Sequence, residues 1–187
     1  MNFAMLKADA KADIKGNVIV LFLMMLVVSL ITSAAAAILP GVGSLLVTPI
    51  FSLALCHVFL KLSRGSKPEF GELFAHFSDF VPALLTGLLT ALYTFLWSLL
   101  FVIPGIIKAI SYSQAMYILA ENPGMSATDA INRSKAIMDG HKMEYFLLNL
   151  SFIGWHILGA VTCGIAYIWV LPYLNATLAN FYQEVSR

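Results

Sequence analysis

The first charge-free run of the chain decides its fold class. It covers residues 16–60 and reads GNVIVLFLMMLVVSLITSAAAAILPGVGSLLVTPIFSLALCHVFL, 45 residues without Lys, Arg, Asp or Glu. A helix that crosses a membrane needs about 20 apolar residues. The dipeptide Pro40-Gly41 divides the run, so the sequence predicts two spans, Asn17–Leu39 and Gly41–Leu60, joined by a tight turn.

Two further runs, residues 80–107 and 145–183, also lack charge. Charged residues make up 11% of the whole chain, against about 25% in soluble proteins. We therefore predict four more spans, and the second of them is short for a bilayer. These spans are Phe80–Ile103, Gly105–Ala120, Lys142–Ala160 and Gly164–Tyr182.

The basic residues favour counting Gly105–Ala120 as a span. With six spans and a cytoplasmic N-terminus, ten of the eleven basic side chains face the cytoplasm, as the positive-inside rule expects. With five spans, the basic residues after Glu121 would face outward. We predict a plasma-membrane protein with both termini in the cytoplasm. The ten residues are Lys7, Lys11, Lys15, Lys61, Arg64, Lys67, Arg133, Lys135, Lys142 and Arg187.

A cleaved signal peptide is the alternative reading of the N-terminus, because small residues follow the first apolar stretch. The charged lead-in over residues 1–16 is long and carries acids, and the apolar run exceeds that of a usual signal peptide. We therefore favour a retained first span.

An amphipathic segment precedes each pair of spans. Residues recur at helical spacing on one face of each segment, which is typical of helices in the membrane interface. Ser126 with Asp129 resembles a capping box at the start of the third segment. The three faces consist of Phe3, Leu6, Ala10 and Ile14; of Phe70, Leu73, Phe74, Phe77 and Phe80; and of Ala127, Ala130, Ile131, Ser134 and Met138.

These features predict an all-α fold, a polytopic bundle of six transmembrane helices. The helices form three hairpins, each preceded by an interfacial helix, in a single membrane domain over residues 1–187. Its three sub-units cover residues 1–60, 66–121 and 125–184.

The second half of the chain resembles a known family. The segments are IPGIIKAISYSQAMYILAENPGMSATDAINRSKAIMDGHK (103–142), LSFIGW (150–155) and LPYLNATLANFY (171–182). They resemble a bacterial integral-membrane family known only as a domain of unknown function (number nine-seven-five). The IPG turn and the helix after it are more distantly similar to the membrane domain of glycerophosphodiester phosphodiesterases. The resemblance implies a plasma-membrane protein without an assigned reaction.

Lys108 is the only charged residue inside a predicted span, so it marks a candidate site. Ser111 and Tyr112 share its helical face, and we expect His156 at a similar depth. Together these four residues could bind an anionic headgroup or another small anion in the outer leaflet. The alternative is that the Lys108 side chain extends to the outer headgroups without a binding role.

Other chemistry has little support in the sequence. We find no metal-ligand spacing, no phosphate-binding glycine loop, no catalytic pair of acids and no basic patch suited to nucleic acid. We therefore expect no cofactor and no catalytic or metal-binding residue. We predict a non-enzymatic membrane component that acts through packing on lipid, on a second copy or on a partner membrane protein. The alternative is a small oligomeric transporter, channel or lipid-translocating protein.

Overall fold

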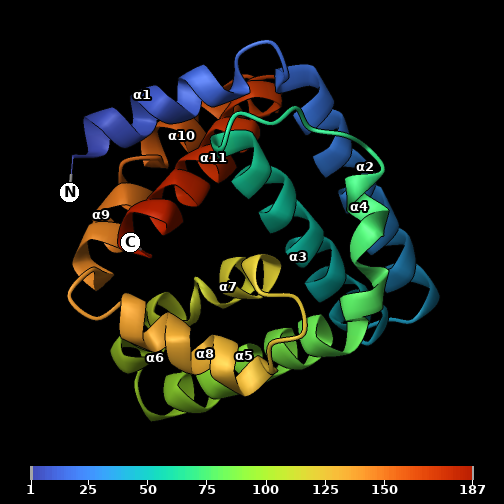
Figure 1. The fold of residues 1–187 in the computed structure, drawn as a ribbon, viewed down its shortest axis with the longest axis vertical. Coiled ribbons are helices and arrows are strands. Elements are labelled where there is room, and N and C mark those ends of the chain that lie inside the picture. Colours follow the sequence, from blue (N-terminus) through green and yellow to red (C-terminus); the bar gives the residue numbers. More distant parts are fainter. Residues whose placement is uncertain (1, 187) are drawn as a thin grey trace.

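The computed structural model describes residues 2–186, apart from the side chains of His76, Phe77 and Leu100. The predictions for Phe77 and Arg187 therefore lie outside the described residues. Every regular element between residues 2 and 186 is helical (Figure 1). The elements are α1 (Phe3–Ile14), α2 (Val18–Ile38), α3 (Gly43–Ser63), α4 (Glu72–Ala75), the 3-10 turn η1 (His76–Asp79), α5 (Phe80–Leu100), α6 (Val102–Tyr112), α7 (Ala115–Glu121), α8 (Ala127–Ile137), α9 (Lys142–Leu150), α10 (Ile153–Val161) and α11 (Tyr167–Val185).

The predicted turn at Pro40-Gly41 is confirmed between α2 and α3. Gly41 has a φ of +81°, a conformation that glycine adopts without strain. Gly43 begins α3 directly against the end of α2, where a Cβ atom on it would lie 1.9 Å from the carbonyl oxygen of Ala35. The close approach of the two helices therefore requires glycine at position 43.

The next turn lies at Phe101, not at Pro104-Gly105 as we predicted. Phe101 is extended, with φ −159° and ψ 146°, and α6 begins directly after it. Pro104 fits within the first turn of α6, where the missing N–H would have no partner in the helix. Gly105 packs against α5, because a Cβ there would lie 2.2 Å from Ser98 Oγ.

Two predicted spans are interrupted in the structure. The fourth is divided into α6 and α7 at Ser113–Gln114, and the fifth into α9 and α10 at Ser151–Phe152. In both places the regular helix stops for two residues, so neither span is a single α-helix.

Two of the three amphipathic segments form the predicted helices. The faces predicted for α1 and α8 are buried, apart from the half-buried Phe3. The sequence predicted that these faces lie in the membrane interface. In the structure they contact other helices instead. The α1 helix packs on α11, and Lys7 Nζ lies 2.7 Å from Ser151 Oγ at the interruption between α9 and α10.

The prediction of one amphipathic helix over residues 69–80 was wrong. The segment forms the four-residue α4 and the η1 turn, which leads directly into α5. Of its described phenylalanines, Phe70, Phe74 and Phe80 are exposed, and Leu73 alone is fully buried. A helix of four residues buries little more than one side chain, so this segment cannot bury a continuous apolar face.

The most apolar helix is among the least buried ones. In the most apolar stretch of α2, 11% of the residues are buried, compared with 50% in α3. A soluble protein would bury such a helix, whereas a membrane protein exposes it to lipid. Leucine, isoleucine, valine and phenylalanine side chains are also exposed on α5, α6, α9 and α10.

Five helical segments of the described chain are long and apolar enough to cross a membrane, judged by length and composition. They are Val18–Ile38, Gly43–Ser63, Phe80–Leu99, Val102–Glu121 and Lys142–Val161. The more polar α11 is not one of them. It lies inside the fold with buried residues along its length, next to α1, α2 and α3. The α5 helix crosses α3 instead of running alongside it (Figure 1).

Candidate functional site

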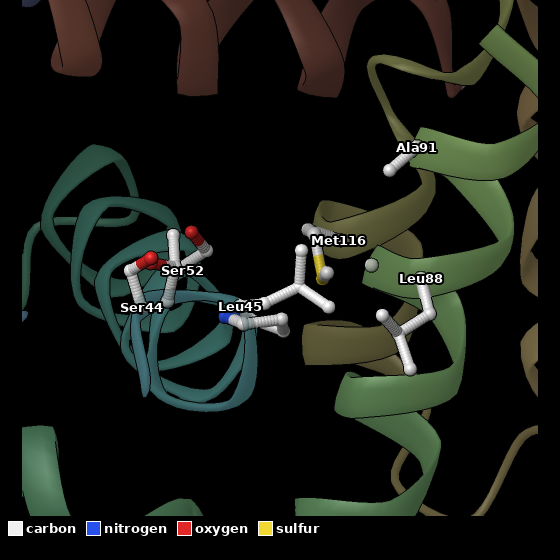
Figure 2. A pocket seen from close by; sticks show the side chains of 9 residues that line it. Ser44, Leu45, Ser52, Leu88, Ala91 and Met116 are labelled. Atoms are coloured by element: carbon white, nitrogen blue, oxygen red, sulfur yellow. The ribbon is translucent and has the colours of Figure 1, made fainter. Parts of the chain in front are cut away.

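A groove lies between α3, α5 and α7 (Figure 2). It has a volume of about 330 Å³. The α3 wall carries Ser44, Thr48 and Ser52, and the opposite wall is apolar, with Leu88 and Ala91 from α5. Met116 of α7 lies between the two walls in Figure 2.

A second groove of about 530 Å³ adjoins the first and shares Gly87, Ala91 and Met116 with it. Its walls combine the Thr90–Ser98 stretch of α5 with the end of α6. Volumes of this size fall within the range of small-molecule and lipid sites, about 300–1,000 Å³. We call the two together the hydroxyl groove. Besides the three shared residues, it is lined by Ser44, Leu45, Thr48, Pro49, Ser52, Leu88, Thr90, Thr94, Phe95, Ser98, Tyr112, Ser113 and Ala115.

Gly87 allows the three helices to meet at the floor of the groove. A Cβ atom at this position would lie 2.7 Å from Pro49 Cγ and 3.4 Å from Met116 Cε. Pro49 lies inside α3 and lacks the backbone N–H that a helix interior normally uses. The close packing of α5 against α3 therefore requires glycine at position 87, where it contacts Pro49.

The interruption between α6 and α7 borders the groove and is held by α8. Ser134 Oγ donates to the carbonyl oxygen of Ser111 at 2.8 Å and accepts from the backbone N–H of Gln114 at 3.2 Å. One buried hydroxyl thus satisfies a donor and an acceptor that the broken helix leaves free. The Gln114 side chain is 1% exposed, and its Oε1 has no hydrogen-bond partner.

Three of the four predicted site residues lie on α6 but have different surroundings. Lys108 is half-buried, and its Nζ lies 4.7 Å from the centroid of the Trp97 ring on α5. Ser111 is buried and donates to the carbonyl oxygen of Ile107. Tyr112 is buried and lines the groove, with Lys135 Nζ 5.5 Å from its ring centroid.

His156 lies apart from these residues, on α10. Its ring is exposed, and its centroid is 6.0 Å from that of Tyr167. Among the described residues, no hydrogen bond or ring contact joins His156 to α6. The structure therefore places Tyr112 in the groove lining, buries Ser111 outside that lining, holds Lys108 against Trp97 and leaves His156 in the last hairpin.

The sequence contained a signal for the groove that we did not use. Hydroxyl residues recur every four positions on α3, at Ser44, Thr48 and Ser52. They recur in the same way on α5, at Thr86, Thr90, Thr94 and Ser98. A spacing of four residues places side chains on one face of a helix. Two such faces in neighbouring spans indicate a polar surface within an apolar segment.

A second polar region joins the C-terminal ends of α3, α7 and α11. Arg64 donates to Glu121, and the Tyr182 hydroxyl donates to Glu121 Oε2 at 2.6 Å. Nearby, Asn180 of α11 donates to Asp13 of α1 at 2.8 Å. Burial raises the pKa of Asp13, and the hydrogen bond from Asn180 opposes that shift in part. These contacts tie three helix ends to one another.

In the described part of the chain, no group of three His, Cys, Asp or Glu side chains is placed to hold a metal ion. The hydroxyl groove likewise offers neutral hydroxyl groups and apolar surface, with no acid, base or thiol among its described lining residues. The arrangement is suited to binding a molecule that is partly apolar.

An all-helical fold with five segments of the described chain long and apolar enough to cross a membrane indicates the class, a membrane protein. The chain belongs to the family described as Protein of unknown function (DUF975), which it matches over residues 1–111 and 99–187. The family resemblance seen in the sequence is thereby confirmed, whereas the more distant similarity to glycerophosphodiester phosphodiesterases is not shown. No curated protein and no solved structure matches the chain.

Proposed function

We propose that this protein is a non-enzymatic, multi-pass component of the plasma membrane that binds lipid in the hydroxyl groove. The observation that carries the proposal is the position of the groove. Its walls are largely apolar, and exposed side chains of the same helices, such as Leu45 and Phe95, border it. In a bilayer these exposed side chains would contact acyl chains, so a lipid is the molecule with direct access.

We further propose six spans with both termini in the cytoplasm. The charge distribution supports this topology, as does the contact between Arg64, Glu121 and Tyr182. These residues lie at the C-terminal ends of α3, α7 and α11, which correspond to the second, fourth and sixth spans. In a six-span topology these three ends lie on the same side of the membrane. A homo-oligomer or a partner membrane protein is compatible with the exposed apolar faces.

Transport of a small solute or lipid is the second candidate. Its specific support is the interrupted helix at Ser113–Gln114, because discontinuous helices often form transport sites. The unpaired Gln114 Oε1 adds a polar atom at this interruption. Flux of a fluorescent lipid across reconstituted vesicles would separate this candidate from a binding protein without transport.

Filling the groove tests the proposed lipid binding. Ala91→Trp places a large ring in both halves of the groove, and Leu92→Trp places the same ring one residue away, at an exposed position outside the groove lining. We expect Ala91→Trp to weaken lipid retention about tenfold, the effect of a clash of about 1.4 kcal/mol. Native mass spectrometry of the purified protein measures the retained lipid. Equal retention by the two variants would contradict the proposal.

A further inference from the structure

The polar atoms of the hydroxyl groove are not all used within the protein. Ser98 and Ser113 donate to carbonyl oxygens of their own helices. In contrast, Thr90 Oγ1 is buried and has no hydrogen-bond partner, and the same holds for Thr86 Oγ1 one turn earlier on α5. Burying a hydroxyl without a hydrogen-bond partner costs free energy. A ligand that supplies the missing hydrogen bond is therefore bound more tightly.

Charge is absent from the described lining. None of the described residues that line the two halves of the groove is Lys, Arg, Asp, Glu or His. An anionic headgroup placed there would lose its hydration without gaining an opposite charge. The ligand is therefore uncharged where it contacts the groove.

The apolar lining defines the remainder of the ligand. Leu45 and Leu88 line one half, Phe95 lines the other, and Met116 lies between them. Methionine adapts its shape to flexible apolar partners. Hydrocarbon chains suit such a surface, whereas a sugar or another fully polar solute would leave these side chains without apolar contact.

We propose that the hydroxyl groove selects an uncharged lipid with a free hydroxyl group, of the diacylglycerol type, over an anionic phospholipid. The inference rests on the proposed lipid binding and specifies its ligand. The lipid hydroxyl exchanges hydrogen bonds with Thr90, and its acyl chains lie along the apolar wall.

Competition between two lipids tests this selection. The purified full chain is mixed with equal amounts of dioleoylglycerol and dioleoyl phosphatidylmethanol, an anionic phospholipid without a free hydroxyl, and native mass spectrometry gives the ratio bound. We expect dioleoylglycerol to be favoured at least about fivefold, because one hydrogen bond contributes that factor and the desolvated anion adds to it. Equal binding of the two lipids, or a preference for phosphatidylmethanol, would overturn the selection and leave lipid binding intact. Binding of neither lipid would overturn both proposals.

Replacing Thr90 by valine tests whether the Thr90 hydroxyl makes the hydrogen bond that selects the lipid. Thr90→Val keeps the shape of the side chain, and we expect it to lower the preference about fivefold, the contribution of one hydrogen bond, without weakening phosphatidylmethanol binding. Thr32→Val is the matched control, because the Thr32 hydroxyl lies on α2 and already donates to the Val28 carbonyl. An unchanged preference in Thr90→Val would exclude this threonine as the selecting group. The wild-type competition tests the selection even if the variant fails to fold.

Discussion

Replacing Gly43 by alanine is expected to separate α2 from α3 and to cost about 3 kcal/mol or more of stability. The added Cβ would lie 1.9 Å from the Ala35 carbonyl oxygen and 2.6 Å from its carbon. Both are backbone atoms, so no side-chain rotation relieves the clash. Domains are stable by about 5–15 kcal/mol in total, and much of the variant should therefore be unfolded or aggregated in detergent. Thermal unfolding followed by size-exclusion chromatography measures the loss.

Gly154→Ala is the control for this substitution. Gly154 lies in α10, and a Cβ there meets no atom within 4 Å. Alanine should stabilise that helix by about 0.5–1 kcal/mol, because it is the better helix former. If Gly43→Ala were as stable as Gly154→Ala, the tight α2–α3 turn would be incorrect.

Ser134→Ala is expected to destabilise the protein by about 2–6 kcal/mol. The substitution leaves two buried backbone groups without a partner, the Ser111 carbonyl and the Gln114 N–H, at about 1–3 kcal/mol each. The α6–α7 interruption should then lose its support from α8. The midpoint temperature of unfolding in a defined detergent measures this loss.

Ser126→Ala provides a control on the same helix. Ser126 caps α8 by accepting from the Asp129 N–H at 3.1 Å, in an exposed position. The loss of such a cap costs about 1 kcal/mol. Ser134→Ala should therefore be clearly the more harmful of the two. A larger effect of Ser126→Ala would argue against the bridging role of Ser134.

Much of the helical pattern was predictable from hydropathy and turn residues. The charge-free run over residues 16–60, divided at Pro40-Gly41, correctly predicted α2 and α3. Hydropathy and turn residues are both local signals, so they can be recognised in the sequence. The capping pair at Ser126 and Asp129 gave the start of α8 for the same reason. At Phe101 the prediction failed, since a proline in a helical first turn and a proline in a loop look alike in sequence.

The candidate site was harder to predict because it depends on contacts between distant segments. The sequence drew attention to Lys108, since charge within a span is conspicuous, but Trp97 lies against this side chain. The groove is formed where Gly87 meets Pro49, 38 positions away in the chain. The interruption at Ser113–Gln114 is likewise tied to Ser134 of α8, a contact that helical periodicity does not reveal.

The side of the membrane on which α8 lies tests the six-span account most directly. Ala136 is exposed on α8, so Ala136→Cys can be labelled, whereas Ser134 is buried. The label is a membrane-impermeant maleimide applied to intact cells, in a background with Cys56→Ala and Cys163→Ser. A parallel Cys56→Ala variant keeps the native Cys163, which is exposed in the turn before α11. Labelling of Cys163 serves as the control for a residue on the outer face of the membrane.

We expect Cys163 to react in intact cells and Ala136→Cys to react only after the membrane is permeabilised. That result would place residues 122–141 on the cytoplasmic side, as six spans require. Labelling of Ala136→Cys in intact cells would contradict the six-span topology and the cytoplasmic position of the C-terminus.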